Sequence, residues 1–423
     1  MSNVITTLTE RGFVSQKSDF DLADKLARPV TLYAGFDPTA ESLHIGHLMQ
    51  IMLLAQFQRH GHRPIALVGG ATAMIGDPSG KSQERVLLSH ETIEKNVVGI
   101  QAQLQHFLDF DGGASSALLV NNFDWIGKFS FIEFLRDVGK HFRVGEKMGK
   151  ESVRKRLQSE AGMSFTEFSY QLLQSYDFLH LSRQYDCVLQ VGGDDQWGNI
   201  TAGIDLVRRL EGKVTYGLTS PLLTNASGQK FGKTEAGAVW LDEKKTSPYE
   251  FYQYWIRSDD RDVIKLLKFF TFLPLEQIAE LEKTVQAEPE KRQAQMVLAA
   301  EVTKMVHGEE AVRIAQKASQ VLYGQEISGL SDRDLNDIFA EVPSTSFARS
   351  RLESGLPLLD ALCETKICSS RGEAKKLVKS GGVYANNVKL DNMDHSFGVG
   401  SLASETILVL RSGKKNYHLL KFE

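Results

Sequence analysis

Residues 31–57 read TLYAGFDPTAESLHIGHLMQIMLLAQF, a strand-like run, a polar loop and a helix-like run in succession. The apolar and β-branched run Thr31–Phe36 is typical of a buried strand. From Ile45 to Phe57 apolar side chains recur at i, i+3 and i+4, which predicts a helix, and Gly61 can cap its end. A second strand candidate follows at Pro64–Val68. Strand, helix and strand in this order predict a parallel sheet.

The same alternation continues to about residue 225. Further strand candidates lie at Ala117–Val120, Val188–Val191 and Leu218–Leu223. The sequence therefore predicts an α/β protein with a doubly wound, Rossmann-like parallel sheet. In such sheets ligands bind beyond the carboxyl ends of the strands, so we expect the binding residues in the loops that follow the strands.

Beyond the predicted sheet domain the composition changes in steps. We divide the chain into a sheet domain (1–225), a loop segment (226–246), a helical domain (247–320), a linker (321–350) and a small α+β domain (351–423). The helical domain has few strand signals. The linker is short, polar and punctuated by Gly, Ser and Pro.

Overall composition excludes several classes of protein. The chain has 423 residues, of which 42% are apolar and 24% charged, values of a folded globular protein rather than of a collagen-like or disordered one. No apolar run reaches the roughly 18 residues of a membrane span, and Met1–Phe20 lacks the apolar core of a secretory signal. Cys187, Cys363 and Cys368 have no metal-ligand spacing, so we predict no metal site, reduced thiols and a cytoplasmic location.

Charge is distributed unevenly along the chain. The net charge is −4, which does not suggest nucleic acid as a partner. The window from Lys366 to Lys389, however, carries six basic side chains and one acidic one. An acidic body with a compact basic appendage is compatible with RNA binding by the appendage alone.

Two histidines mark the start of the first predicted helix. His44 and His47 are three residues apart and share one face at the positive end of the helix dipole. Imidazole donors there can bond phosphate oxygens and stabilise charge that develops on them. Gly46 leaves room for a planar group such as a base. An isolated HxGH tetrapeptide is more often a pair of surface histidines, but the preceding strand and the following helix favour an anion site.

These residues resemble the first motif of class I aminoacyl-tRNA synthetases, which reads HIGH. The second motif of that family, KMSKS, resembles Lys230-Phe231-Gly232-Lys233-Thr234, with Phe for Met, Gly for Ser and Thr for Ser. The two retained lysines can hold a triphosphate and the departing pyrophosphate. A near match to a P-loop, Gly76-Asp77-Pro78-Ser79-Gly80-Lys81-Ser82, has one residue too few between its glycines, and we reject it. Lys81 and Arg85 remain candidates for a phosphate contact.

A polar stripe marks a later helix. Tyr170, Gln174 and Asp177 fall at i, i+4 and i+7 and share one face. A polar stripe is usually the solvent face of a helix, but this one contains no lysine. It suits a small polar ligand.

The resemblance narrows to the bacterial tyrosyl-tRNA synthetase family, because YAGFDPTAESLHIGH, YQLLQSYD, GGDDQWGNI and KFGKT match it in order. It implies a tyrosine–tRNA ligase that forms tyrosyl-adenylate from tyrosine and ATP with Mg²⁺ and then charges tRNA(Tyr). The implied tyrosine site is Tyr33, Asp77, Tyr170, Gln174, Asp177, Gln190 and Gln196. The implied ATP site is Gly35, Asp37, Gly46, Gly193, Asp195 and Lys233, and the implied catalytic set is Thr39, His44, His47, Lys230, Lys233 and Thr234.

For the remaining chain the resemblance implies an RNA-binding half. The tail resembles the S-four (alpha-L) RNA-binding domain, with Arg371, Lys375, Lys376 and Lys379 as phosphate contacts. The helical domain would approach the anticodon, and the protein would be a homodimer. The rivals are a tryptophanyl-tRNA synthetase, a small HxGH nucleotidylyltransferase and a synthetase-derived RNA-binding protein without activity. Asp177 and the basic tail disfavour the first, and the second would lack the lysine loop.

Overall fold

The computed structural model describes residues 3–79, 88–145, 153–154, 157, 162–226, 228, 231–234, 237–322, 324–340, 342–413 and 416–423. The chain forms two compact units. The first contains Met1–Thr246 and Trp255–Val306, and the second contains Ser247–Tyr254 and His307–Glu423.

The first unit is built on a sheet that has, within the described residues, six strands in the order β1-β6-β5-β2-β3-β4. They are β1 (Gln16–Lys17), β2 (Thr31–Phe36), β3 (Arg63–Val68), β4 (Leu118–Asn121), β5 (Cys187–Gly193) and β6 (Tyr216–Ser220). β2 to β6 are parallel, and β1 is antiparallel to β6. The chain winds from β2 to β4, then returns to β5 on the other side of β2. The predicted doubly wound α/β class is confirmed, with its switch point between β2 and β5.

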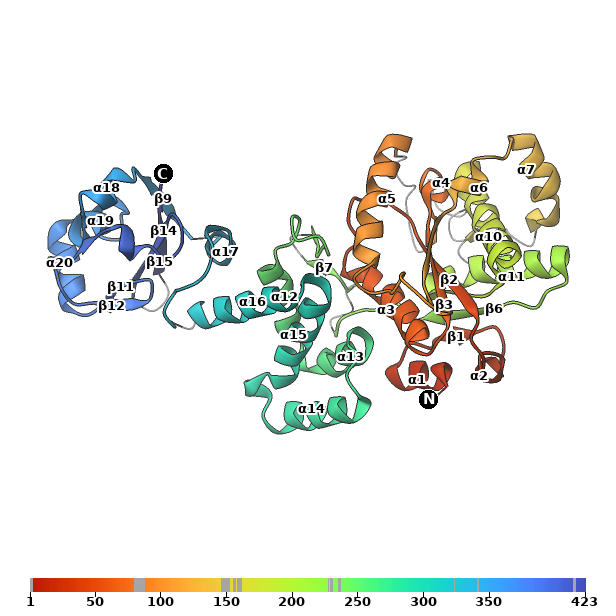
Figure 1. Cartoon of the computed structure of the whole chain (residues 1–423), viewed down its shortest axis with the longest axis horizontal. Coiled ribbons are helices and arrows are strands. Elements are labelled where there is room, and N and C mark those ends of the chain that lie inside the picture. Colours follow the sequence, from red (N-terminus) through yellow and green to blue (C-terminus); the bar gives the residue numbers. More distant parts are fainter. Residues whose placement is uncertain are drawn as a thin grey trace. The chain divides into compact units, whose positions relative to one another are not determined.

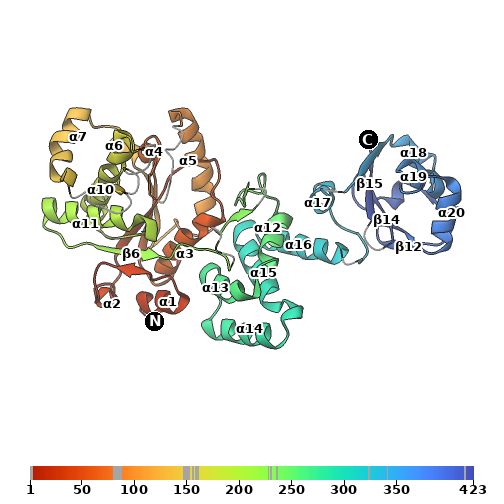
Figure 2. The same ribbon diagram turned by 180° about the vertical axis from the view of Figure 1, so that it is seen from behind.

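Helices cover both faces of this sheet. Figures 1 and 2 show α3 and α5 on one face and α10 and α11 on the other. The described residues of this unit form the helices α1 (Val4–Arg11), α2 (Leu22–Lys25), α3 (Ile45–Arg59), α4 (Gly70–Ala73), α5 (His90–Leu104), α6 (Phe123–Ile126), α7 (Phe131–Asp137), α10 (Phe165–Tyr185), α11 (Trp197–Glu211), α13 (Asp260–Phe270) and α14 (Leu275–Ala287), and all but the last residue of α15 (Gln293–His307). Single 3₁₀ turns occur at η1 (Gly139–His141), η2 (Asp194–Gln196) and η3 (Pro289–Lys291), and a short ribbon joins β7 (Lys233–Thr234) to β8 (Gly237–Ala238).

Most predicted boundaries lie close to the observed ones. β2 spans the predicted Thr31–Phe36, and α3 ends at Arg59, followed by Gly61 in the left-handed region with φ +86°. β6 ends at Ser220, earlier than the predicted Leu223, because Pro221 has no N–H to donate to the sheet.

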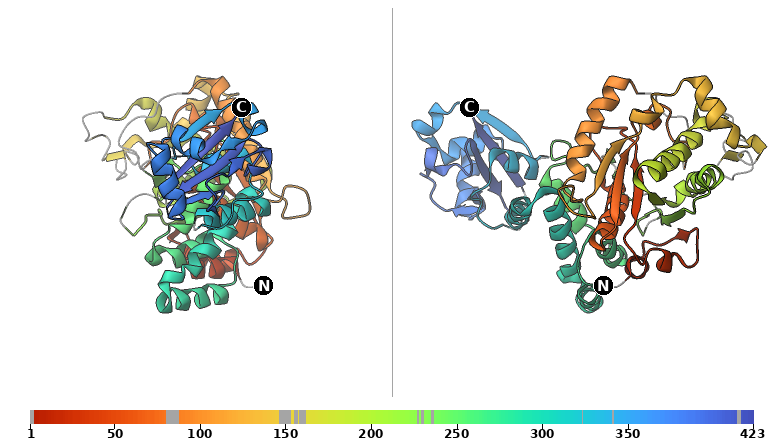
Figure 3. Two further views of the ribbon diagram at one scale, coloured as in Figure 1. Left: turned by 90° about the vertical axis from the view of Figure 1, so that its left-hand side faces the viewer. Right: turned by 45° about the vertical axis from the view of Figure 1, so that its right-hand side comes forward.

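The second unit contains a second sheet with the strand order β12-β11-β14-β15-β9 in the described chain, and Figure 3 shows it from two sides. Its strands are β9 (Ser344–Phe347), β11 (Val383–Ala385), β12 (Val388–Leu390), β14 (Ile407–Ser412) and β15 (Asn416–Phe422), beside a small pair of β10 (Leu356–Pro357) and β13 (Ser396–Phe397). Its helices are α16 (Glu309–Leu322), α17 (Asp332–Ile338), α18 (Ser350–Glu353), α19 (Leu358–Glu364) and α20 (Arg371–Lys379), with the 3₁₀ turn η4 (Val399–Ser401), and α12 (Pro248–Ile256) begins in this unit.

Strand alternation gives this second sheet two apolar faces. On β14, Leu408 and Leu410 pack in the cluster that contains residues of α19 and α20. Ile407 and Val409, on the opposite face, pack with residues of α16 and α17. The sheet is therefore buried between two sets of helices.

The segment 321–350, for which the sequence predicts a linker, is partly structured. It contains α17 and β9, and β9 pairs in parallel with β15. Leu335 and Ile338 are buried in the cluster beneath β14. α17 starts with a capping box between Ser331 and Asp334, so the polar residues that suggested a linker serve to start a helix.

Within the described residues, none of the helices combines the length and the apolar composition that a membrane span requires.

Candidate active site

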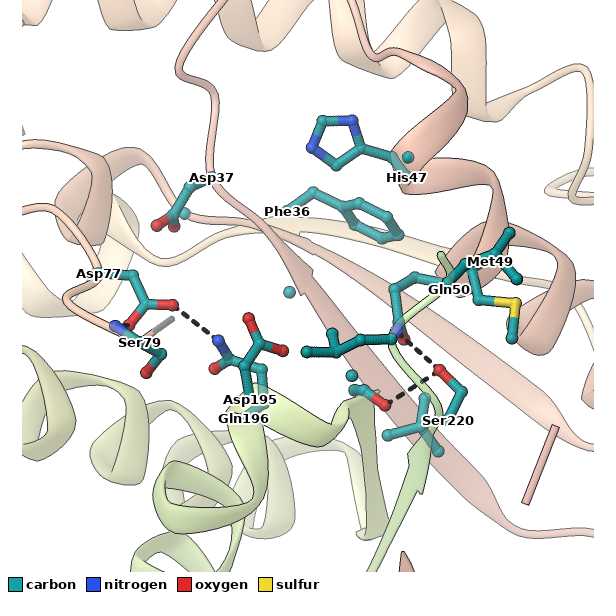
Figure 4. A pocket seen from close by; sticks show the side chains of 18 of the residues that line it. Phe36, Asp37, His47, Met49, Gln50, Asp77, Ser79, Asp195, Gln196 and Ser220 are labelled. Carbon is teal, nitrogen blue, oxygen red and sulfur yellow. Dashed lines mark hydrogen bonds between the residues drawn. The ribbon is translucent and has the colours of Figure 1, made fainter. Parts of the chain in front are cut away.

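A pocket of about 530 Å³ opens at the carboxyl ends of β2 and β5, the predicted position for a ligand in this fold. Figure 4 shows side chains from β2, β6, α3, η2 and the loop after α4 converging on it. Fifteen predicted site residues line it: Tyr33, Gly35, Asp37, Thr39, His44, Gly46, His47, Asp77, Tyr170, Gln174, Asp177, Gln190, Gly193, Asp195 and Gln196. Residues far apart in the sequence are thus brought to one cavity.

The lysine-containing loop is described in part. Lys230 lies outside the described residues, as do Lys81 and Arg85, and for Lys233 and Thr234 the backbone of β7 is described without the side chains. The loop lies against the start of α3, because a Cβ built on Gly232 would lie 3.2 Å from the Gly46 nitrogen. The two motifs therefore meet at the rim of the pocket.

His44 and His47 cap the start of α3 reciprocally. The His44 Nδ1 accepts a hydrogen bond from the Gly46 N–H at 3.0 Å, and the His47 Nδ1 accepts one from the His44 N–H at 3.2 Å. Since each Nδ1 is an acceptor, the hydrogen-bond geometry assigns the proton of each neutral ring to Nε2. Both imidazoles line the pocket and can present this N–H to an anion.

Gly46 has a geometric reason to lack a side chain. A Cβ at this position would lie 2.7 Å from the His44 Cε1 and 2.9 Å from its Nδ1. A side chain would push the His44 ring away from the helix start. The glycine thus keeps the histidine cap in place, in addition to the open space that the sequence predicts for it.

The deep end of the pocket is formed around the Asp177 carboxylate, which is 1% exposed. Its Oδ1 accepts a hydrogen bond from the Trp125 Nε1 at 2.8 Å, and its Oδ2 accepts one from the Asn122 Nδ2 at 3.0 Å. Burial raises the pKa of Asp177 to about 7, and the two hydrogen bonds hold it from rising further. The carboxylate is oriented and retains lone pairs for a further donor.

Two buried polar atoms of residues that line the pocket have no hydrogen-bond partner within the described part of the chain. The Tyr33 hydroxyl and the Gln190 Oε1 are buried, and neither finds a hydrogen-bond partner among the described residues. The Tyr33 ring is fixed against Phe178, with centroids 5.3 Å apart, and burial raises the pKa of its phenol. Buried polar atoms are rarely left unpaired, so these two atoms fit a ligand that carries a hydroxyl group.

A network of carboxylate and amide groups lines the middle of the pocket. The Asp77 Oδ2 accepts a hydrogen bond from the Gln196 Nε2 at 2.7 Å (Figure 4), and the Gln196 Oε1 accepts one from the Gln174 Nε2 at 3.2 Å. The Asn199 Nδ2 donates to the Gln174 Oε1 at 3.0 Å. Such a network of fixed acceptors around an acid suits a cationic ligand group.

Asp37 lies beside this network rather than apart from it. Its Oδ2 accepts a hydrogen bond from the Tyr170 hydroxyl at 2.9 Å, and its Oδ1 accepts one from the Thr72 hydroxyl at 2.8 Å. The family resemblance predicts an ATP contact for Asp37. The geometry adds that Asp37 holds the predicted tyrosine-site residue Tyr170.

Comparison with known proteins identifies the family. Residues 25–324 match the model of tRNA synthetases class I (W and Y), and residues 334–420 match that of the Tyrosine--tRNA ligase SYY-like C-terminal domain. The chain belongs to the class I tRNA synthetases. A curated tyrosine--tRNA ligase of Rhodopirellula baltica is 53% identical over 425 residues, covering 100% of this chain and 97% of its own. That of Geobacillus stearothermophilus is 50% identical over 424 residues, covering 99% and 100%.

Solved structures agree with the synthetase fold. A C-terminally truncated mitochondrial tyrosyl-tRNA synthetase of Aspergillus nidulans matches with a TM-score of 0.70 at 31% identity, covering 76% of this chain and 95% of its own. A tryptophanyl-tRNA synthetase of Encephalitozoon cuniculi matches with a TM-score of 0.52 at 16% identity, covering 78% and 90%, which shows a shared fold alone.

The sequence of this synthetase did not indicate several residues that hold the pocket-lining side chains in place. Thr72, Asn122, Trp125 and Asn199 hold the predicted ligand-facing groups but are not in the predicted set. Asn122 directly follows β4, so the rule that polar residues after strands build the site could have found it. Trp125 carries no such signal, since an aromatic residue in a short helix is most often part of the core.

In the C-terminal domain of this synthetase the predicted RNA contacts lie on one exposed helix. Arg371, Lys375, Lys376 and Lys379 are all exposed on α20, while Ala374 and Val378 face the core. Arg371 forms an ion pair with Asp360, and no ion pair is present for the three lysines within the described part of the chain. Glu373 bonds Ser369 at the start of the helix and leaves the lysine charges uncompensated.

Proposed function

We propose that the pocket activates L-tyrosine with ATP and that the enzyme then transfers the tyrosyl group to the 3′-terminal adenosine of tRNA(Tyr). The chain is a tyrosine–tRNA ligase by its relatives at about half identity over its whole length. The assignment of tyrosine as the substrate rests on the buried pair of Asp177 and Tyr33 at the closed end of the pocket. The test is whether the purified protein forms acid-precipitable tyrosyl-tRNA from tyrosine, ATP and tRNA. We expect this product, and its absence with tRNA that is known to accept tyrosine would refute the proposal.

The phenol of tyrosine fits the deep end. Its hydroxyl would donate to Asp177 and bond the Tyr33 hydroxyl, which has no other partner among the described residues. Phenylalanine would leave the Tyr33 hydroxyl unpaired and would offer no donor to Asp177, so the pocket rejects it without any editing step. The indole of tryptophan could donate its N–H to Asp177 but has no oxygen to pair with the Tyr33 hydroxyl.

The α-ammonium group fits the middle network. Asp77, Tyr170, Gln174 and Gln196 supply its acceptors, with Gln190 nearby. Because Asp77 and Gln196 bond each other directly, the ammonium group meets a preformed cradle rather than separate side chains.

The phosphates fit the rim. Thr39 would face them from the loop after β2, and His44 and His47 from the start of α3. Lys230, Lys233 and Thr234 would close over them from the second motif. The tyrosine carboxylate attacks the α-phosphate directly, so that no side chain becomes covalently attached and the protein contributes positioning and charge stabilisation. Gly35, Asp37, Gly46, Gly193 and Asp195 would border the nucleoside. Mg²⁺ would arrive with ATP, and we assign it no protein ligand.

The C-terminal domain would hold the tRNA backbone through Arg371, Lys375, Lys376 and Lys379, with Arg371 the weakest contributor because Asp360 already neutralises it. The helical segment 247–320 would approach the anticodon. For the domain division we keep the proposed catalytic, loop and helical segments, and we assign α17 and β9 of the segment 321–350 to the C-terminal domain with which they pack. A cytoplasmic location is supported by the three free cysteines.

We further propose that the enzyme is a homodimer. Exposed large apolar side chains concentrate between residues 131 and 165, and among the described residues of α7 none is buried. Phe131 is 65% exposed, Ile132 70% and Phe165 66%. A surface of this kind on a folded enzyme is typical of a subunit interface, and a second copy brings the same apolar groups.

The double variant Phe131→Asp/Ile132→Asp should dissociate the dimer. Sedimentation equilibrium at micromolar concentration should give twice 47.2 kDa for the wild type and 47.2 kDa for the variant. Val98→Asp is the matched control, because Val98 is 67% exposed on α5. A wild type of 47.2 kDa would refute the dimer, and a double variant that stays dimeric would refute this interface.

A further inference from the structure

The loop after β5 carries two successive carboxylates, Asp194 and Asp195, that face different surroundings. Asp195 lines the pocket, and Figure 4 shows it at the centre of the site. Asp194 does not belong to the pocket lining and bonds the neighbouring strands instead. The function proposed above leaves Asp194 without a role.

Three donors fix the Asp194 carboxylate. Its Oδ1 accepts hydrogen bonds from the Thr219 hydroxyl at 2.6 Å and the Gln16 Nε2 at 3.1 Å, and its Oδ2 accepts one from the Ser15 hydroxyl at 2.6 Å. The donors are themselves held in register, since Gln16 pairs with Thr219 between β1 and β6 and the Ser15 N–H donates to the Thr219 carbonyl at 2.8 Å. A carboxylate bonded by several fixed donors has one orientation.

This anchor acts on the turn that carries Asp195. Asp194 is the first residue of η2 and Gln196 is the last. Gln196 donates to Asp77 at 2.7 Å, so the turn is held at both ends, with Asp195 between them. Gly193 leaves room on the pocket side, because a Cβ there would lie 2.7 Å from the Asp195 Oδ1.

We propose that Asp194 is a positioning residue for ATP binding: it anchors η2 to β1 and β6 and thereby directs Asp195 towards the nucleoside. The inference rests on the proposed ATP contact of Asp195. The proposal also assigns a role to the two-residue strand β1, because Gln16 of β1 is one of the three donors and Ser15, another donor, directly precedes the strand.

The test is steady-state ATP–pyrophosphate exchange with the full-length enzyme. Asp194→Ala should raise the KM for ATP about tenfold, the loss expected for one displaced hydrogen-bonded contact, and leave the KM for tyrosine within about twofold. Asp194→Asn keeps one acceptor and should recover part of the loss. Thr219→Val, which removes one donor at constant volume, should raise the KM for ATP by a smaller factor. Asp205→Ala, on α11 and ion-paired with Arg208, is the control and should change neither KM.

An Asp195→Ala variant and the double variant separate the two proposals. If Asp194 acts through Asp195, the double variant should have the same KM for ATP as Asp195→Ala alone. An Asp195→Ala variant with a normal KM for ATP would refute the proposed ATP contact itself. An effect of Asp195→Ala without any effect of Asp194→Ala, or equal rises in both KM values on Asp194→Ala, would refute the positioning role.

Discussion

Replacement of Asp177 by alanine should remove nearly all tyrosine activation from an enzyme that remains folded. The change deletes the proposed acceptor for the substrate phenol and leaves the Trp125 Nε1–H without its acceptor, while the Asn122 Nδ2 keeps only its hydrogen bond to the Thr72 hydroxyl. We expect kcat/KM for tyrosine in ATP–pyrophosphate exchange to fall about hundredfold or more, the effect of losing a charge-assisted hydrogen bond in a buried site. The KM for ATP should stay within about twofold, because the residues that we propose for the nucleoside and phosphates lie at the other end of the pocket.

The pH dependence of tyrosine activation provides a second test of the role of Asp177. Since burial raises the pKa of Asp177 to about 7, the carboxyl group of the free enzyme is protonated below that pH and ionised above it. The ionised form is the better acceptor for a phenol, so kcat/KM for tyrosine should rise as the pH increases through about 7. Asp177→Asn keeps one acceptor oxygen but cannot ionise, and its profile should lack this rise. A rise that persists in the variant, or an alanine variant that activates tyrosine normally, would refute the assignment.

Reversal of the three unpaired lysines of α20 should separate tRNA charging from amino-acid activation. In the triple variant Lys375→Glu/Lys376→Glu/Lys379→Glu we expect the KM for tRNA(Tyr) to rise about hundredfold, because attractive phosphate contacts become repulsive. The salt dependence of kcat/KM should also weaken, with the logarithmic slope smaller by about 2 to 3. Tyrosine-dependent exchange in the absence of tRNA should be unchanged, since these residues belong to the second unit.

A matched variant controls for the change of net charge. Lys25→Glu/Lys128→Glu/Lys244→Glu alters three exposed lysines of the first unit by the same total charge, and none of these lysines forms an ion pair within the described residues. It should leave the KM for tRNA much closer to that of the wild type. Equal effects of the two triple variants would mean that general repulsion, and not the α20 surface, explains the loss. Normal tRNA charging by the α20 variant would refute the proposed RNA-binding site.

The fold was predictable because its signals are local. The apolar run Thr31–Phe36 reflects a strand that is buried on both faces of a parallel sheet. The periodicity from Ile45 reflects a helix that packs against that sheet. Both patterns can be recognised within one short segment of sequence. The boundary of β6 was misjudged by three residues because the apolar pattern continues through Pro221, although proline ends the ladder. β9 was not foreseen, since Ser344–Phe347 lacks an apolar run and is a strand because it pairs with β15.

The candidate site was predictable to the extent that its residues belong to recognisable motifs. The pocket lining contains every predicted residue of the first unit whose side chain is described. The supporting residues were not predictable, since a partner such as Asn122 is 55 residues from Asp177 and the sequence does not show that they meet. The role proposed for Asp194 was not predictable, because the sequence alone does not show which of two adjacent carboxylates faces the ligand.

The most direct test of the central claim is ATP–pyrophosphate exchange by the wild-type enzyme with each of the twenty amino acids in turn. The geometry of Tyr33 and Asp177 predicts strong exchange with tyrosine and exchange close to background with phenylalanine and tryptophan. Strong exchange with tryptophan, or none with tyrosine, would contradict the account.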